Sequence, residues 1–266
     1  MKNDADHLQV SSIPVLPRLS AVSVGFKNDA KRQKSVADTL KSDARSCIVW
    51  YIRHCYLCNK KMIQEFLINQ GYRLKPDGVI GPKTLSALKE YISSKSPMPF
   101  DLLSGWTMLY IRTNQSFTNK FSDFGIVIKG GDIKKIFPAS TKAGDFYVFN
   151  PLTVGGITGT AVAAEQYAHN SHTFVTARNW STLWLKAPYF KQTGSIMIYR
   201  DGNRDRLVNK VNKQIGMFGI NLHRGGLASL VNRWSAGFNV APDADWFEVC
   251  KLFSNGDVVS YCLIEA

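Results

Sequence analysis

The chain has 266 residues, of which 45% are hydrophobic and 20% are charged, and its formal net charge is +13. This length suffices for two domains with hydrophobic cores, whereas no apolar run approaches the roughly 20 residues that a membrane-spanning helix needs. The basic residues are spread along the chain rather than gathered in one block. The charge therefore favours anionic envelope polymers and, non-specifically, nucleic acid as partners, and it does not choose between them, whereas its even spread argues against specific nucleic-acid binding.

Residues 1–45 have the composition of a polar arm rather than of a compact domain. Pro14, Pro17, serines and alternating charges are typical of a linker, and short apolar patches from Val10 to Val24 are suited to docking on a partner. The start of the chain is polar and acidic, and the apolar stretch of a secretory signal does not follow it. We therefore expect a protein that is made in the cytoplasm without a signal peptide and reaches its target through lysis, a pore, a secretion machine or a virion.

Residues 46–58 are expected to form a helix that carries three of the five cysteines. Cys55 and Cys58 share one face at helical spacing, and His54 beside them raises a zinc site as an alternative. Zinc requires two further ligands, and only Cys47 and His54 lie near, so helix packing explains the pair better. An odd number of cysteines without a signal peptide indicates free thiols from a reducing compartment. We expect no cofactor and no metal ion.

A helix–turn–helix pattern follows over residues 58–92. Ile63, Phe66 and Leu67 form an apolar stripe at i, i+3 and i+4, and Gly71 is suited to end that helix in the left-handed conformation. An Asp-Gly turn comes next, and a glycine at the N-cap and a proline at the first helical position then begin a second helix. The residues that define the pattern are Tyr72, Asp77, Gly78, Gly81, Pro82 and Thr84.

This pattern closely resembles the small helical peptidoglycan-binding domain of bacterial and phage wall hydrolases. The resemblance implies an all-α bundle over residues 46–97 that binds peptidoglycan, with the six defining residues as its candidate contacts. A generic helical hairpin with a Gly-Pro turn is the alternative. Residues 93–99 have the composition of an interdomain linker.

From residue 98 to residue 266 the pattern becomes mainly β, so the whole chain is expected to be an α+β multidomain protein. Short alternating segments separated by turn residues are typical of a sandwich-like or barrel-like domain. Cys250 and Cys262 flank an Asn255-Gly256 turn, which predicts a hairpin with the two cysteines on opposite faces. The expected strands are 124–128, 133–138, 146–149, 194–199, 216–222 and 258–264.

Near the C-terminus, Gly219–His223 predicts a strand that ends in a histidine, and a tight turn with Ser235, Gly237 and Phe238 begins twelve residues later. This layout resembles the active-site segment of the L,D-transpeptidase family, in which a histidine precedes a Ser/Thr-x-Gly-Cys motif. Phe238 takes the place of the nucleophilic cysteine. Residues 140–147 also resemble a strand entry of that family, with an alanine where a proline is usual.

In an active member of that family, the histidine activates a thiolate that attacks a peptide carbonyl, and backbone N–H groups of the turn stabilise the oxyanion. The resemblance implies these roles for His223 and the turn at Gly237, but Phe238 has no lone pair and no ionisable group. We therefore expect transpeptidase or hydrolase chemistry to be lost or greatly weakened. Ser235 is an alternative nucleophile if the turn re-aims its hydroxyl. An ordinary strand-end histidine beside a turn glycine is the simplest alternative.

Two other polar clusters have spacings that fit metal sites poorly. Glu165, His169 and His172, with His223 as a further candidate ligand, suggest a zinc hydrolase, but the helical H-E-x-x-H spacing is missing, which favours loop histidines. The segment Asp201–Asp205 has oxygen-bearing side chains at its first, third and fifth positions, as a calcium-binding loop does at its start. It lacks the glycine and the glutamate that such a loop requires, which favours a hairpin turn.

These patterns together predict a phage-like, peptidoglycan-binding, cell-wall-directed protein of the endolysin or tail-lysin type, with a degenerate L,D-transpeptidase-like domain. The alternative is a structural or adaptor component of a virion tail or baseplate without catalytic activity, attached to tail proteins through residues 1–45. A hydrolase with an unrecognised set of catalytic residues is a third hypothesis. Each of them places the protein at the bacterial cell wall, in the periplasm or in a virion.

Overall fold

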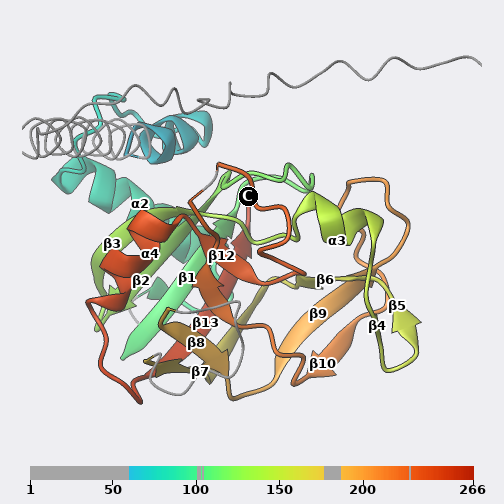
Figure 1. Cartoon of the computed structure of the whole chain (residues 1–266). Coiled ribbons are helices and arrows are strands. Elements are labelled where there is room, and N and C mark those ends of the chain that lie inside the picture. The colour runs from blue at the N-terminus through green and yellow to red at the C-terminus, as the bar shows by residue number, and fades with distance from the viewer. Residues whose placement is uncertain (1–59, 101–102, 104, 177–186, 228) are drawn as a thin grey trace, which may run out of the picture. The chain divides into compact units, whose positions relative to one another are not determined.

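The computed structural model describes residues 60–266 except 101–102, 104, 177–186 and 228. Every described residue belongs to one compact unit of the chain (Figure 1). The expected arm, the helix expected over residues 46–58 and three of the cysteines lie outside the described residues. Within the described part, no helix is long and apolar enough to cross a membrane.

An eight-stranded sheet forms the body of this unit (Figure 1). Strand β1 lies inside the sheet, where it pairs in parallel with β13 and antiparallel with β2. The mainly-β expectation for the C-terminal part is therefore confirmed. In sheet order the strands are β12 (Asn239–Ala241), β11 (Leu222–Arg224), β8 (Tyr189–Gln192), β7 (Gln166–Val175), β13 (Val258–Glu265), β1 (Trp106–Arg112), β2 (Asp123–Lys129) and β3 (Asp132–Ala139).

The two ends of this sheet meet, so the sheet is nearly closed. Ser140, directly after β3, donates its backbone N–H to the carbonyl of Val240 in β12 at 2.8 Å, and the Val240 N–H donates back at 3.0 Å. The expected sandwich-like form is thus replaced by a sheet that curls onto itself. Closure satisfies backbone groups that would otherwise lie along two open edges.

Two small sheets and two short helices accompany the large sheet in the part of the described chain after β1. One small sheet has the order β10 (Gln214–Gly216), β9 (Ile196–Asp201), β6 (Thr160–Ala163), and the other joins β4 (Thr153–Val154) to β5 (Ile157–Thr158). The helices are α3 (Asp145–Phe149) and α4 (Asp243–Cys250).

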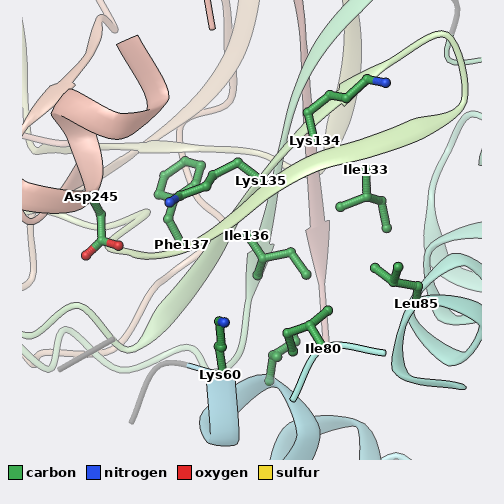
Figure 2. A pocket seen from close by; sticks show the side chains of 10 residues that line it. Lys60, Ile80, Leu85, Ile133, Lys134, Lys135, Ile136, Phe137 and Asp245 are labelled. Carbon is green, nitrogen blue, oxygen red and sulfur yellow. The ribbon is translucent and has the colours of Figure 1, made fainter. Parts of the chain in front are cut away.

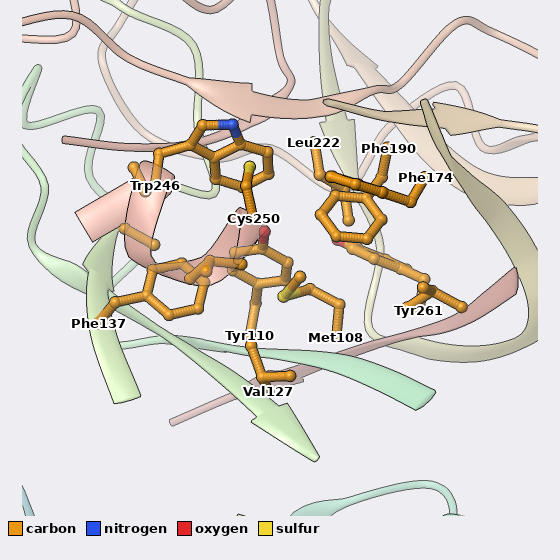
Figure 3. Close-up of a cluster of buried hydrophobic side chains, with 14 of the residues drawn as sticks. Met108, Tyr110, Val127, Phe137, Phe174, Phe190, Leu222, Trp246, Cys250 and Tyr261 are labelled. Atoms are coloured by element: carbon orange, nitrogen blue, oxygen red, sulfur yellow. The ribbon is translucent and has the colours of Figure 1, made fainter. Parts of the chain in front are cut away.

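The side chains of β1 and β13 are buried on both faces of the sheet. Met108 and Tyr110 of β1 and Tyr261 of β13 lie on the inner side, in a cluster closed by Trp246 of α4 (Figure 3). The alternate residues of β1, Leu109 and Ile111, belong to a second cluster on the opposite face. Burial on both faces explains why these strands read as near-continuous apolar runs.

The second cluster is completed by helices. A helix over residues 60–69 and helix α2 (Pro82–Lys95) bring Ile63, Leu67, Leu88 and Ile92 against the outer face of the sheet. These helices therefore share their apolar core with the strands. Helix α2 also extends to the third residue of the predicted linker and ends where the Ser96 N–H bonds to the Ile92 carbonyl.

Three local expectations are wrong. The expected strand 146–149 is helix α3, because aromatic residues that favour strands here follow a Gly-Asp helix start. The expected strand 216–222 is divided between β10 and β11 by Gly219, whose φ is +70°. The expected hairpin between Cys250 and Cys262 is a helix-to-strand connection, because residues 243–250 form α4 with Trp246, Val249 and Cys250 as its buried stripe.

Cys250 and Cys262 are free and buried, and both are expected to resist alkylation in the native protein. Burial raises the pKa of the Cys250 thiol to about 12 and that of Cys262 to about 11. At pH 8 both thiols therefore stay protonated, and only the thiolate is nucleophilic. Iodoacetamide labelling with peptide mapping should show both unmodified before denaturation and modified after it. Native labelling of either within minutes would contradict this burial.

Candidate functional site

Two short parallel strands bring the predicted histidine and the predicted turn together. Strand β11 carries His223, which lies opposite Val240 of β12, and the turn 235–238 leads directly into β12. The histidine and the turn, twelve positions apart in sequence, thus lie on neighbouring strands of one sheet. The structure brings together all four predicted residues of this site: His223, Ser235, Gly237 and Phe238.

The His223 ring is buried and held in one tautomer. Its side chain is 4% exposed, and Nδ1 lies 2.6 Å from the carbonyl oxygen of Arg224. A carbonyl only accepts, so Nδ1 carries the proton and Nε2 presents a lone pair. Burial lowers the pKa of His223 to about 4, which the hydrogen bond to the Arg224 carbonyl opposes only in part. At neutral pH the ring is therefore an uncharged base.

Ser235 holds the turn together with both functions of its hydroxyl. The Oγ donates to the carbonyl of Phe238 at 2.7 Å and accepts from the N–H of Gly237 at 3.1 Å. The residue is completely buried. Its hydroxyl is thus committed to the backbone of the turn.

Gly237 lets the turn pass against strand β6. Its φ is +122°, and a Cβ on this residue would lie 2.0 Å from the carbonyl oxygen of Ala161. Both the backbone conformation and the close approach require glycine. This requirement fixes where the next residue, Phe238, points.

The Phe238 ring faces His223. The two ring centroids are 5.4 Å apart at an interplanar angle of 62°, an edge-on contact. The phenyl ring also packs on a buried apolar cluster that includes Ile196, Ile198 and Ile220. At the position where the resemblance places a thiol, this chain thus has an aromatic side chain anchored by packing.

The predicted peptidoglycan-binding residues surround one buried side chain that the sequence did not single out, Gln64. Its Nε2 donates to Asp77 Oδ1 and the Val79 carbonyl at 3.0 Å and to Thr84 Oγ1 at 3.3 Å, and its Oε1 accepts from the Gly78 N–H at 2.8 Å. The hydrogen bond from Gln64 is the main cause of the lowered pKa of Asp77. Three of the six predicted residues therefore hold the loop 77–81 onto the first helix.

The other three predicted residues shape the same segment. Gly81 is the N-cap of α2 and Pro82 its first residue, as expected. Tyr72 packs, partly buried, against the cluster shared with the sheet. None of these three positions requires a ligand to explain its contacts.

Replacing Gln64 by alanine is expected to lower the free energy of unfolding by about 2–3 kcal/mol, because the Gly78 N–H and the Val79 carbonyl lose their partner in a buried site. Gln70, which is exposed on the same segment, is the matched control, and Gln70→Ala should change stability by less than about 0.5 kcal/mol. Urea denaturation measures both variants. Equal effects of the two would show that the Gln64 hydrogen bonds are not the cause.

Residues 59–106 match the model of the family described as "Predicted Peptidoglycan domain". The match confirms the resemblance of the helical segment. It runs from the first helix through α2 to Trp106, the first residue of β1. No curated protein matches the chain.

Solved structures similar to parts of the chain are L,D-transpeptidases. The enzyme from Stackebrandtia nassauensis is 15% identical over 76% of this chain and 75% of that chain, with a TM-score of 0.33. The one from Xylanimonas cellulosilytica is 17% identical over 71% and 73%, with a TM-score of 0.32. L,D-transpeptidase 1 of Mycobacterium tuberculosis is 10% identical over 61% and 63%, with a TM-score of 0.23.

An ion pair that sequence reasoning missed fixes the loop after His223. Arg224 donates to Asp243 Oδ2 at 3.0 Å, and the Gly226 N–H donates to Asp243 Oδ1 at 2.8 Å. The Arg224 guanidinium also lies over the Trp234 ring, 5.0 Å from its centroid. Through Arg224, strand β11 is therefore joined to Asp243 of helix α4 and to Trp234, the residue before the turn 235–238.

The segment 140–147, which resembles a strand entry, leads instead into helix α3 and lies against the turn. The Gly144 N–H donates to the Ser235 carbonyl at 2.9 Å, and a Cβ on Gly144 would lie 1.9 Å from the Asn232 carbonyl oxygen. Asn119 joins the same contact, because its Oδ1 accepts from the Asn232 N–H at 2.6 Å and its Nδ2 donates to Asn232 Oδ1 at 2.9 Å. No local signal in the sequence marks Asn119.

A buried ionic network anchors Thr141 and Lys142 of the segment 140–147 to Asp123. Lys142, 1% exposed, donates from Nζ to Asp123 Oδ1 at 3.2 Å and to the Asn114 carbonyl at 2.9 Å. Burial lowers the pKa of Lys142, and the charge of Asp123 opposes that shift. Asp123 also accepts from the backbone N–H and the hydroxyl of Thr141. Every partner is satisfied within the protein, so the network has a positioning role.

The histidines of the alternative zinc site have structural partners. His172 is buried on β7, with Nε2 2.9 Å from the Ile220 carbonyl and Nδ1 2.9 Å from the Ser171 hydroxyl. His169 lies in a polar contact with Tyr167 and Ser260. In the described part of the chain, no group of three or more His, Cys, Asp or Glu residues is placed to hold a metal ion.

In the calcium-like segment, the carboxylates of Asp201 and Asp205 accept hydrogen bonds from nearby backbone N–H groups and so form a set of turns. Asp201 Oδ2 accepts from the Asn209 N–H at 2.8 Å, and Asp205 Oδ1 accepts from the Leu207 N–H at 2.8 Å. The hydrogen bond from the Leu207 N–H is the main cause of the lowered pKa of Asp205. The carboxylates thus stabilise the connection after β9.

Proposed function

We propose that this chain is a peptidoglycan-binding, cell-wall-directed protein whose L,D-transpeptidase-like domain is catalytically degenerate. The observation that carries the proposal is the contact between Phe238 and His223 in the turn before β12. The family match over residues 59–106 supports peptidoglycan as the partner. The net charge of +13 favours approach to an anionic wall.

The chemistry of the site supports the loss of catalysis. A cysteine-type acyl transfer requires a thiol beside the histidine base, and a phenyl ring can neither give up a proton nor attack a carbonyl. Ser235 does not replace the thiol, because its hydroxyl donates to the Phe238 carbonyl within the turn. The Nε2 atom of His223 is able to accept a proton, but the side chain at residue 238 offers no nucleophile for it to activate.

We further propose a phage-like context of the endolysin or tail-lysin type, with action at the wall or carriage in a virion. A structural or adaptor role in a virion tail or baseplate is the second candidate, with residues 1–45 as the attachment to tail proteins. The missing nucleophile favours this candidate as well, because an adaptor needs binding without turnover. Association of the full chain with purified particles, lost on deletion of residues 1–45, would distinguish it.

The test is sedimentation with purified sacculi combined with mass spectrometry of soluble fragments. The full chain should sediment with the sacculi and release no muropeptides. Products that appear with the unaltered chain and vanish in His223→Ala would overturn the degenerate assignment and indicate a working hydrolase. Failure to sediment would overturn wall binding itself.

A further inference from the structure

The amine of Lys142 lies within hydrogen-bond distance of a side-chain amide and of a carboxylate at the same time. Its Nζ is 3.2 Å from Asn114 Oδ1 and 3.2 Å from Asp123 Oδ1. Lys142 is 1% exposed and Asp123 is completely buried, whereas Asn114 is half-buried. Water therefore competes little for the amine, and the fold holds an amine and an acyl group in contact before any reaction begins.

The amide of Asn114 is held by hydrogen bonds at both of its polar atoms. Its Oδ1 accepts from the Ser116 N–H at 3.0 Å, and its Nδ2 donates to Thr113 Oγ1 at 3.2 Å. A backbone N–H directed at a carbonyl oxygen stabilises the negative charge that develops there when a nucleophile adds. The Thr113 hydroxyl also lies 3.3 Å from Asp123 Oδ1, so a hydrogen-bonded path joins the carboxylate to the amide nitrogen.

The carboxylate of Asp123 is placed to take a proton from Lys142. Burial lowers the pKa of Lys142, which makes the uncharged amine easier to form, and the charge of Asp123 opposes that shift in part. Only the uncharged amine has a lone pair with which to attack. Of the two neighbouring acyl groups, the neutral amide of Asn114 is the better electrophile, because a negative carboxylate repels the lone pair.

We propose that Lys142 and Asn114 form an intramolecular isopeptide bond. The ammonium of Lys142 gives one proton to Asp123, and its lone pair adds to Cγ of Asn114, which places the negative charge on Oδ1. Asp123 passes its proton through the Thr113 hydroxyl to Nδ2 and takes a second proton from the amine nitrogen. Ammonia then leaves with the electron pair of the Cγ–Nδ2 bond, the carbonyl forms again, and Asp123 returns its proton to the ammonia. One ammonium side chain and one amide thus become one amide and one ammonium ion, and nothing is oxidised or reduced.

The bond would join two segments that flank strands β2 and β3. Asn114 follows the end of β1, and Lys142, 28 positions later, follows β3 in the segment that lies against the turn 235–238. A covalent link of this kind stabilises a fold chiefly by constraining the unfolded chain. Unlike a disulfide, it does not depend on the redox state of the surroundings.

Lys134 provides a comparison within the same part of the chain. Its ammonium pairs with Asp132 at 3.0 Å, but the side chains of this pair are 38% and 66% exposed. Figure 2 shows its side chain extended from β3. An ammonium in contact with water is strongly hydrated and stays charged, so we expect Lys134 to form no covalent bond.

The experiment is measurement of the intact mass of the denatured full chain, followed by tryptic mapping. We expect a mass about 17 Da below that of the sequence, because one ammonia is lost. Trypsin does not cut after an acylated lysine, so the map should contain a joined peptide in which residues 113–120 are attached to Lys142. Asn114→Ala should keep the full mass of its sequence, whereas Lys134→Gln, the matched control, should still show the loss.

A succinimide at Asn255-Gly256 is a second reaction that would remove one ammonia, and Asn255→Gln should therefore still show the loss. The proposal is overturned if the full chain keeps its sequence mass after a week in native buffer, or if the loss disappears in Asn255→Gln or persists in Asn114→Ala. A joined peptide attached through Asp123, with loss of water, would overturn Asn114 as the acyl group. The map of the unaltered chain decides by itself, so the test holds even where a variant fails to fold.

Discussion

Gly237→Ala is expected to lower the free energy of unfolding by about 3–5 kcal/mol, because backbone strain and overpacking act at one position. Alanine at a φ of +122° is strained, and its Cβ would meet the Ala161 carbonyl oxygen at 2.0 Å. That oxygen belongs to strand β6, so relief requires a shift of backbone rather than of a flexible side chain. Chemical denaturation of the purified variant measures the loss.

Two other glycines separate the two causes. Gly256 has a φ of +92°, and no heavy atom lies within 4 Å of the place that a Cβ would take, so Gly256→Ala should lose only about 1–2 kcal/mol through strain. Gly144 has an ordinary φ of −76° but would place a Cβ 1.9 Å from the Asn232 carbonyl oxygen, so Gly144→Ala should lose about 1–3 kcal/mol through overpacking. If Gly237→Ala loses no more free energy of unfolding than Gly256→Ala, the backbone of β6 at Ala161 moves away from the new Cβ without a measurable loss of stability.

Phe238→Cys is expected to create the one strongly reactive thiol among the described residues. The new sulfur would lie beside the His223 ring, whose Nε2 lone pair is able to take its proton, whereas Cys250 and Cys262 stay protonated and buried. Because burial lowers the pKa of His223 to about 4, the ring does not hold a thiolate at rest but accepts the thiol proton as the sulfur attacks, which we expect to raise the labelling rate at pH 7 roughly tenfold. Iodoacetamide labelling with peptide mapping measures the rate at residue 238.

The double variant Phe238→Cys, His223→Ala is the control for activation. Its thiol should react roughly tenfold more slowly at pH 7 than the thiol of the single variant, and the difference should shrink as the pH rises above about 8.5. Equal rates at pH 7 would mean that His223 does not activate this position. The same pair of proteins, incubated with sacculi, shows whether stem-peptide products require both groups.

The sequence predicted those features that depend on nearby residues. The stripe of Ile63 and Leu67 and the Gly81-Pro82 start predicted two helices that are present. The expected strand 258–264 lies within β13. The sequence predicted a strand that carries His223 and, after a loop, the Ser-x-Gly turn; the structure adds that β11 and β12 pair side by side.

What the sequence did not predict depends on partners far apart in the chain. Asn119 and Asn232 are 113 residues apart, and neither has a neighbour that signals the contact. The closure of the sheet rests on hydrogen bonds between Ser140 and Val240, so a sandwich and a curled sheet have the same strand pattern. Helix α4 is only eight residues long, too short for its period to distinguish it from a strand.

The apolar cluster that the helices share with the outer face of the sheet makes the two parts cooperative. Leu88 and Ile92 of α2 lie in the same buried cluster as Leu109 and Ile126, so a cut after residue 97 would expose apolar surface on both fragments. Neither half is then a self-sufficient module that can be moved to another protein. A wall fragment held by the helices would therefore meet the strands in a set orientation.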